Sequence, residues 1–176
     1  MDPQVYVCPL SQVPVAVAQL KPSHLITLLD PQDAIETPKG MKPNRHLKLG
    51  VHDVHELVED MTHPSEAHVG EIIDFIATWE RTAPLLVHCW AGISRSTAAA
   101  FITLCHFNEE GREAELARLI RARAPHAHPN KLMVSHADRI MGRKGRMVEA
   151  VEKLGPGVVL WEGHLFGVPL HPEKAP

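Results

Sequence analysis

An apolar run that leads through a short loop into a helix-forming run is the feature that most constrains the fold of this chain. The first run, Leu85-Leu86-Val87, is followed by His88 and Cys89, and the second covers residues 97–102, Thr-Ala-Ala-Ala-Phe-Ile. A short, wholly apolar run is typical of a strand covered on both faces. A helix that is apolar nearly all round belongs at the centre of a domain. The pattern therefore predicts a buried strand, a tight loop and a buried helix in succession.

The rest of the chain alternates in the same way. Apolar or β-rich runs predict further strands at 5–7, 24–29 and 46–51, and the spacing of apolar residues predicts helices at 65–81, 112–124, 130–141 and 147–154. Prolines and a glycine make residues 31–45 an exposed loop, which we expect near the functional site. Strands that alternate with helices predict an α/β fold, with a central, mainly parallel sheet of about four to five strands flanked by helices.

The length of 176 residues, 44% of them hydrophobic, suits a single domain that spans residues 1–176. Its last part, residues 156–176, is expected to be a C-terminal extension. The apolar but irregular stretch 158–170 within it should pack back over the domain or pair at a sheet edge. A contact between two copies of the chain is the alternative, so a monomer and a homodimer both remain open.

Charge and cysteine content exclude several classes of partner. Lys and Arg number 18 against 21 for Asp and Glu, and the net charge of −3 gives no support for binding nucleic acid or an anionic membrane. No apolar stretch approaches the roughly 20 residues that span a bilayer, and the N-terminus lacks the pattern of a signal peptide. Three cysteines without a compact spacing favour a reducing compartment. We therefore expect a cytoplasmic protein, with neither nucleic acid nor membrane as a partner.

The loop between the buried strand and helix carries the chemistry, in the nine residues His88-Cys89-Trp90-Ala91-Gly92-Ile93-Ser94-Arg95-Ser96. The start of a helix binds anions, because its first amides lack intrahelical partners and its dipole is positive there. A loop of this length can wrap the amides of residues 90–95 around one phosphate. Arg95 would add a planar fork for two phosphate oxygens, and the same positive field would stabilise a Cys89 thiolate beneath the phosphorus. The loop predicts a phosphate-transferring cysteine enzyme.

A lone cysteine at a strand end is usually a small buried hydrophobic residue. Here it has a histidine before it, a glycine three residues on, an arginine six on and a hydroxyl seven on. This set strongly resembles the signature of the protein tyrosine phosphatase superfamily, and its Gly-Ile-Ser-Arg-Ser ending is most similar to the dual-specificity and related small bacterial branches. The resemblance extends from about the first strand to about residue 142, although only the loop is highly specific. It implies a protein tyrosine phosphatase-like fold and hydrolysis of phosphate monoesters through a thiophosphate.

The resemblance also implies a general acid, an aspartate some thirty to forty residues before the nucleophile Cys89. Asp53, which ends the third predicted strand in Leu-Gly-Val-His-Asp, matches that position best. Asp60 lies in a looser stretch and is the second candidate. Asp74 falls within a helix pattern, where we expect it to be buried and less available.

Three other residues of the loop have two interpretations each. The Ser96 hydroxyl can hydrogen-bond the cysteine sulfur as the thiolate leaves, or cap the helix. His88 can orient the loop and help to stabilise the thiolate, a role closer to structure than to proton transfer. Trp90 can form a wall of the pocket or belong to the core.

Cys8 could become a redox partner of Cys89 only if the first strand runs beside the loop.

We expect no metal and no other cofactor. The pairs His52/His55 and His126/His128 have spacings that suit metal ligands. Neither pair has a companion set of carboxylates or cysteines at convincing spacing, and the phosphatase mechanism requires no metal.

The segment between Cys89 and Arg95 contains no Lys or Arg, and phosphatases of polyanions often place basic residues there. Its composition favours a protein phosphomonoester, phosphotyrosine first and phosphoserine or phosphothreonine second. A phosphoinositide or a small phosphoester is the alternative substrate. A rhodanese-like sulfurtransferase and a pseudophosphatase that binds phosphorylated partners without turnover are the rival functions.

Overall fold

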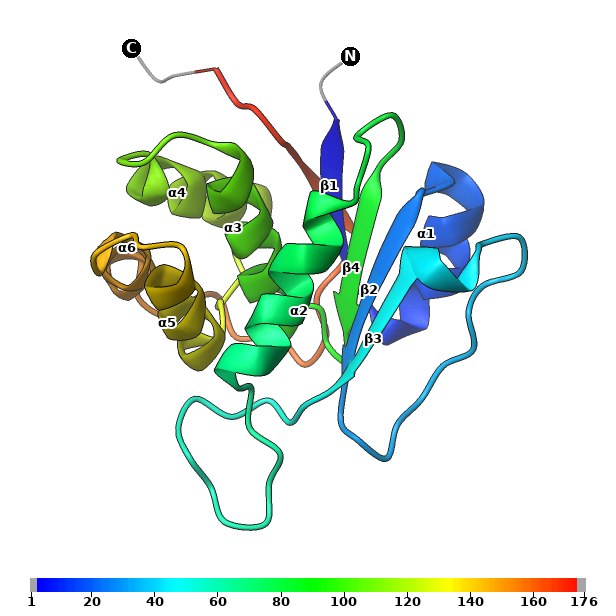
Figure 1. Cartoon of the computed structure of the whole chain (residues 1–176), viewed down its shortest axis with the longest axis horizontal. Coiled ribbons are helices and arrows are strands. Elements are labelled where there is room, and N and C mark those ends of the chain that lie inside the picture. The colour runs from blue at the N-terminus through cyan, green and yellow to red at the C-terminus, as the bar shows by residue number, and fades with distance from the viewer. Residues whose placement is uncertain (1–2, 174–176) are drawn as a thin grey trace.

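Residues 3–173 of the chain are described by a computed structural model, in which a five-stranded sheet is flanked by helices (Figure 1). The strands are β1 (Gln4–Pro9), β2 (His24–Leu29), β3 (His46–Gly50), β4 (Leu85–Cys89) and β5 (Phe166–Pro169). The helices are α1 (Val13–Leu20), α2 (Glu66–Ala77), α3 (Arg95–Phe107), α4 (Glu113–Arg123), α5 (Lys131–Ile140) and α6 (Arg146–Leu154), with short 3₁₀ turns at Leu10–Gln12 and Pro43–Arg45.

The sheet has the strand order β3-β2-β4-β1-β5. The pairs β2–β3, β2–β4 and β1–β4 are parallel, and only β5 runs antiparallel, beside β1 at one edge. This arrangement confirms the α/β fold with a mainly parallel sheet of about five strands. Because the four parallel strands share one direction, their carboxyl ends meet at one edge of the sheet, which is where α/β proteins bind ligands.

Helices cover the two faces of the sheet unequally. Helices α2 to α6 lie over one face and α1 alone covers the other (Figure 1). Every residue of β4 is buried, as expected for a central strand, and α3 is buried from Arg95 to Cys105. The strand–loop–helix unit is therefore confirmed as the centre of the core.

The sequence prediction missed α1 and placed the end of α2 too late. Helix α1, Val-Pro-Val-Ala-Val-Ala-Gln-Leu, is rich in β-branched residues and contains a proline, which a helix tolerates in its first turn. Helix α2 ends at Ala77, and Trp79 is buried beyond it. Helices α2 and α5 begin where the sequence predicts, each with a side-chain cap: the Ser65 hydroxyl accepts from the His68 amide, and Asn130 Oδ1 accepts from the Met133 amide.

The C-terminal segment returns to the sheet, as predicted, and pairs through β5 with the edge strand β1. On its way it is held at several points. The Arg121 guanidinium donates to the carbonyl groups of Leu154, Gly155 and Pro156, and the Gly163 amide donates to the Ala91 carbonyl at 2.8 Å. The extension therefore supports the back of the loop after β4. None of the helices in residues 3–173 is long and apolar enough to cross a membrane.

Candidate active site

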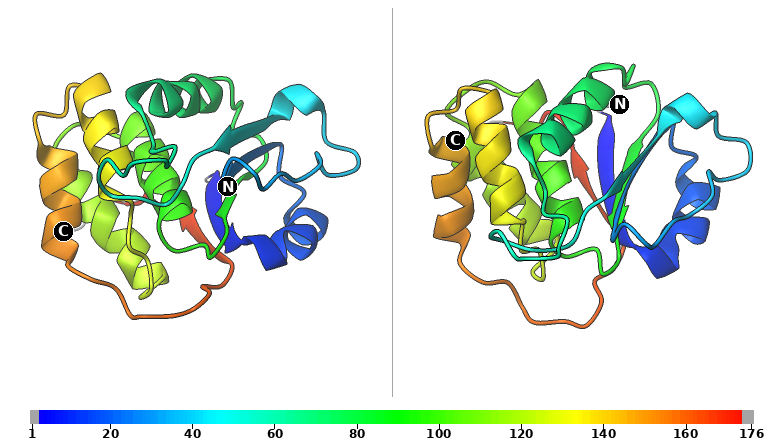
Figure 2. Two further views of the ribbon diagram at one scale, coloured as in Figure 1. Left: turned by 90° about the horizontal axis from the view of Figure 1, so that it is seen from below. Right: turned by 60° about the horizontal axis from the view of Figure 1, so that its bottom comes forward.

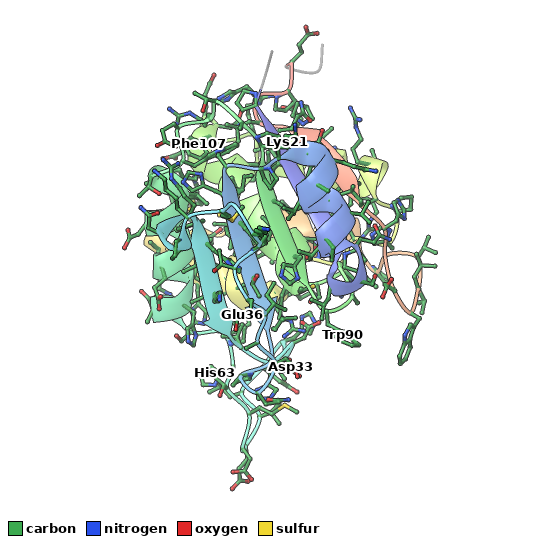
Figure 3. All side chains as sticks on the ribbon, turned by 90° about the vertical axis from the view of Figure 1, so that its right-hand side faces the viewer. Lys21, Asp33, Glu36, His63, Trp90 and Phe107 are labelled. Atoms are coloured by element: carbon green, nitrogen blue, oxygen red, sulfur yellow. The ribbon has the colours of Figure 1, made fainter. Side chains whose placement is uncertain are left out.

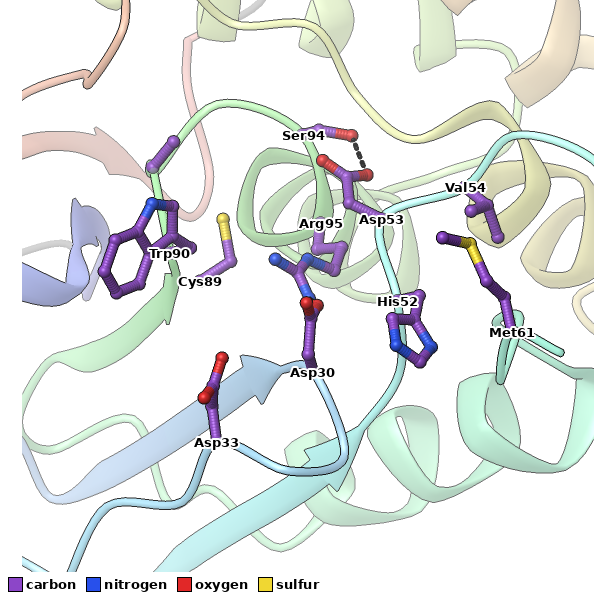
Figure 4. A pocket seen from close by; sticks show the side chains of 11 residues that line it. Asp30, Asp33, His52, Asp53, Val54, Met61, Cys89, Trp90, Ser94 and Arg95 are labelled. Carbon is purple, nitrogen blue, oxygen red and sulfur yellow. Dashed lines mark hydrogen bonds and ion pairs between the residues drawn. The ribbon is translucent and has the colours of Figure 1, made fainter.

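An open cleft of about 500 Å³ lies at the carboxyl edge of the parallel strands. Asp30 follows β2, Asp53 follows β3, Cys89 ends β4 and Arg95 begins α3, and all four line the cleft (Figure 4). In Figure 2, which brings this edge forward, the loop between β3 and α2 and the segment between α6 and β5 both lie beside it. The topology therefore brings together residues that are far apart in sequence.

The loop after β4 closes tightly on the Cys89 sulfur. The Gly92 amide donates to Sγ at 3.2 Å, and the Ser96 hydroxyl lies 3.1 Å from the same atom. Gly92 has a φ of +68°, and a Cβ there would stand 2.7 Å from the Pro9 nitrogen and 2.8 Å from the Cys8 carbonyl carbon. Only glycine fits this turn against β1, and the turn directs an amide at the sulfur.

Arg95 is held below the loop with 4% of its surface exposed. Its Nη1 donates to Asp30 Oδ1 and to the Val51 carbonyl, both at 2.7 Å. Its Nε is buried and has no hydrogen-bond partner among the described residues. A buried donor without a partner costs free energy. Nη1 therefore fixes the guanidinium in place, whereas Nε is left as a donor that an anion can satisfy.

Asp53 is anchored at the rim of the cleft by two donors. The Ser94 hydroxyl donates to Oδ1 at 2.7 Å and the Asn130 side-chain amide donates to the same oxygen at 3.0 Å. Asn130 also donates to the Val54 carbonyl at 2.9 Å, which ties the backbone after β3 to the start of α5. Asp60 and Asp74 do not line the cleft, and Asp74 is exposed on α2 rather than buried as the sequence suggested.

His88 is fully buried on β4 and neutral near pH 7. Burial lowers its pKa to about 4, and the positive charge of Arg95 acts in the same direction. Burial likewise lowers the pKa of His46 on β3 to about 4. The lowered pKa of His88 disfavours stabilisation of a Cys89 thiolate by an imidazolium near neutral pH, and favours the other predicted role, orientation of the loop.

A one-way chain of hydrogen bonds explains how that orientation is achieved. A carbonyl can only accept, so His88 Nδ1–H donates to the Cys89 carbonyl at 3.2 Å and His88 Nε2 accepts from the Thr27 hydroxyl at 2.7 Å. His46 Nε2–H then donates to the Thr27 oxygen at 2.7 Å, and His46 Nδ1 accepts from the Thr37 hydroxyl at 3.1 Å. Two neutral imidazoles and two hydroxyls thus connect the 31–42 segment to the backbone of Cys89.

Cys8 does lie beside the loop, because β1 pairs with β4 in the register Pro9↔Cys89. Its side chain packs on the α1 face of the sheet, however, whereas Cys89 packs on the face of α3. Burial, and next the neighbouring Cys89, raise the pKa of Cys8 to about 12. The geometry therefore disfavours a Cys8–Cys89 disulfide.

The remaining loop residues divide between the front and the back of the cleft. Trp90, 55% exposed, lies at the mouth, so the core interpretation is wrong; Ala91 and Ser94 also line the cleft. Gly92 and Ile93 lie behind it, and the Ile93 carbonyl accepts from the His128 amide. Sequence reasoning missed several residues of the site and its support, among them Thr27, Asp30, Asp33 and Asn130. Only Asp30 and Asp33 carried a signal, as carboxylates just after a strand of the parallel sheet.

The histidine pairs do not form a metal-binding cluster within residues 3–173, where no group of three or more His, Cys, Asp or Glu could hold a metal ion. The His55 and His128 rings lie 5.8 Å apart in an edge-to-face contact, as do the His126 and His164 rings at 4.7 Å.

No protein-family model and no curated protein matches the chain. Its structure is similar to that of DUSP15, with a TM-score of 0.53 and 23% identity over 85% of this chain and 86% of that one. It is also similar to the human tyrosine phosphatase-like serine/threonine/tyrosine-interacting protein, with a TM-score of 0.58 and 19% identity over 78% and 91%. A third neighbour is PTPMT1 in complex with PI(5)P, with a TM-score of 0.51 and 19% identity over 78% and 90%. At these identities the likeness shows the fold, and the expected protein tyrosine phosphatase-like fold is confirmed.

Proposed function

We propose that this chain, which has the fold of the dual-specificity phosphatases, is a cysteine-dependent phosphatase of phosphate monoesters. The observation that carries the proposal is the Cys89 sulfur, which receives a hydrogen bond from the Gly92 amide within a loop closed by Arg95. The orphaned Nε of Arg95 supports the same ligand, because it is a buried cationic donor beside that loop.

In the first step the phosphate lies in the loop, where the amides of residues 90–95 and the Arg95 guanidinium bind its oxygens. The Cys89 thiolate attacks phosphorus, so that an S–P bond forms while the P–O bond to the leaving group breaks. Asp53 gives its proton to the leaving oxygen and becomes a carboxylate.

In the second step water hydrolyses the thiophosphate. The Asp53 carboxylate takes one proton from the water as its oxygen attacks phosphorus, and the S–P bond breaks. The Ser96 hydroxyl, 3.1 Å from Sγ, donates a hydrogen bond to the departing thiolate. Inorganic phosphate leaves, and Cys89 and Asp53 return to their starting states.

The cleft favours a substrate that carries one phosphate. Among residues 3–173, Arg95 is the only Lys or Arg that lines it, whereas Asp30, Asp33 and Asp53 all do. A second phosphate would therefore meet carboxylates instead of cations. This charge pattern favours phosphotyrosine, and secondly phosphoserine or phosphothreonine, over a phosphoinositide that carries additional phosphates. The exposed Trp90 gives the mouth an aromatic surface for the phosphorylated residue.

The rival functions leave parts of the site unexplained. A rhodanese-like sulfurtransferase does not need Gly92, Arg95 and Ser96 at these spacings. A pseudophosphatase usually lacks the nucleophile, the arginine or the acid, and Cys89, Arg95 and Asp53 all line one cleft here.

The test is turnover of an aryl phosphate and of a phosphotyrosine peptide by the purified chain, beside Cys89→Ser and Arg95→Lys. We expect turnover by the wild type, none by Cys89→Ser, and a severe loss in Arg95→Lys because a point charge cannot replace a planar fork. Sulfur transfer from thiosulfate to cyanide is the control for the sulfurtransferase. Wild-type protein that turns over no phosphate monoester, or Cys89→Ser with substantial activity, would overturn the proposal.

A further inference from the structure

A second, apolar groove of about 480 Å³ lies between α1 and the segment after β2. It is lined mainly by apolar side chains, among them Leu10, Val13, Val17, Ala18, Ile35 and Pro38. Val17 and Ile35 are half-buried and Ala18 is exposed, so the groove is open to solvent. No step of the proposed reaction uses it.

The groove adjoins the catalytic cleft. The segment after β2 supplies Asp30 and Asp33 to the cleft and then Ile35 and Pro38 to the groove. On the opposite side, the Leu10 amide donates to the Trp90 carbonyl at 3.0 Å, which joins a residue of the groove to a residue of the cleft. The two sites are therefore close enough for one extended peptide to contact both.

Acidic side chains mark this path. Asp33 lines the cleft and Glu36 lines the groove; both are exposed, and neither forms an ion pair with any residue in 3–173. Figure 3 shows Asp33, Glu36 and Trp90 on one face of the molecule, below α1. Lys39 also lines the groove, but Asp33 and Glu36 outnumber it, so the path as a whole attracts a cationic group and repels an anionic one.

We propose that the groove binds an apolar side chain of a phosphopeptide substrate whose phosphorylated residue occupies the cleft. A basic side chain of the same peptide lies over Asp33 and Glu36. This inference rests on the proposed phosphatase function and specifies its substrate: a phosphorylated segment with an apolar residue and a basic residue close to the phosphate.

The groove is tested with phosphotyrosine peptides that carry leucine or alanine at single positions on either side of the phosphotyrosine. We expect a leucine at one of these positions to raise kcat/KM about tenfold, because the groove would bury most of its side chain. Ala18→Glu, which places a carboxylate in the groove, should abolish that preference. Val15→Glu is the matched control, since Val15 is 54% exposed on the same helix and does not line the groove.

The charge is tested in the same peptides by exchanging a flanking lysine for glutamate. We expect lysine to be preferred, and Glu36→Gln to weaken that preference by a few-fold, as removal of one exposed charge would do. The matched control is Glu71→Gln, because Glu71 is exposed on α2, away from the groove.

Turnover of a small aryl phosphate, which is too small to reach the groove, distinguishes a failure of the groove proposal from a failure of the proposed phosphatase function. If the wild type, Ala18→Glu and Glu36→Gln all hydrolyse it equally, the catalytic function and the fold are intact and the peptide preferences report on the groove alone. Preferences that are absent in the wild type, or unchanged in Ala18→Glu, would overturn the groove while leaving the phosphatase. A phosphoinositide in vesicles that is hydrolysed faster than every peptide would also overturn it. No turnover of the aryl phosphate by the wild type would contradict the phosphatase function itself.

Discussion

Only one of the two carboxyl oxygens of Asp53 accepts the hydrogen bonds from Ser94 and Asn130. Both the Ser94 hydroxyl and the Asn130 amide donate to Oδ1. In the proposed reaction Oδ2 is therefore the oxygen that would carry the transferable proton. The two hydrogen bonds would orient the proposed acid before a substrate arrives, which is what efficient proton transfer requires.

Asp53→Asn should lower the turnover of an alkyl phosphate by about 10² to 10⁴-fold, because an alkoxide leaves poorly without a proton. The loss should be much smaller for an aryl phosphate with an acidic phenol, which leaves as the anion. Steady-state kinetics with a series of leaving groups measure the difference. If Asp60→Asn shows this dependence and Asp53→Asn behaves like the wild type, Asp60 is the acid instead.

Asn130→Ser separates the positioning of the acid from the capping of α5. Serine caps a helix as asparagine does, but it cannot donate to Asp53 and the Val54 carbonyl as the amide does. We expect about a tenfold loss of kcat for an alkyl phosphate, about the value of one lost hydrogen bond, and little change for an activated aryl phosphate. An equal loss for both substrates would assign Asn130 a purely structural role.

At the scale of elements, the buried chain of hydrogen bonds through Thr27 couples three strands of the sheet. Thr27→Val keeps the shape of the side chain but leaves Nε2 of both His46 and His88 without their partner. We expect a loss of about 1–3 kcal/mol in the free energy of unfolding, since buried polar groups are left unsatisfied. Urea denaturation measures it.

The matched control for that change is Thr103→Val. Thr103 is equally buried in α3, and its hydroxyl donates only to the Ala99 carbonyl of its own helix. Its replacement leaves no histidine unpaired and should cost clearly less. Equal losses in the two variants would contradict a special role of the chain.

Local pattern was sufficient to predict the elements that form the site, but not all of their support. Continuous apolarity identified β4 and α3, and the spacing of the loop between them identified Cys89 and Arg95 as candidates. Helix α1 was not predicted, because Val and Pro disfavour a helix locally. Packing of Val13 and Ala16 on the sheet nevertheless stabilises a helix there. Asn130 is 77 residues from Asp53 in the chain, and only the tertiary fold brings it there.

At the scale of the whole molecule, buried histidines link stability to pH. Burial lowers the pKa values of His24 and His126, and it lowers those of His46 and His88 to about 4 in the folded state, so between about pH 6.5 and 4 the unfolded chain binds more protons than the folded one. Stability is therefore fully present above about pH 6.5 and falls as the pH drops, by at most roughly 1.4 kcal/mol per pH unit for each histidine. Denaturation midpoints at several pH values measure this slope.

His46→Asn removes one of these titrating groups and should make the slope shallower. A wild type whose stability stays constant from pH 6.5 to 5, or a variant with an unchanged slope, would show that these histidines are not the neutral partners the hydrogen bonds require.

The central claim, that Cys89 attacks phosphorus, is tested most directly by trapping the covalent intermediate. The protein is mixed with an aryl phosphate, quenched in acid and digested, and the peptide that contains Cys89 is examined by mass spectrometry. The account predicts the added mass of one phosphoryl group on Cys89, most abundant in a variant such as Asp53→Asn whose second step lacks its base, and absent from Cys89→Ser. Turnover without such an adduct, or an adduct on another residue, would contradict it.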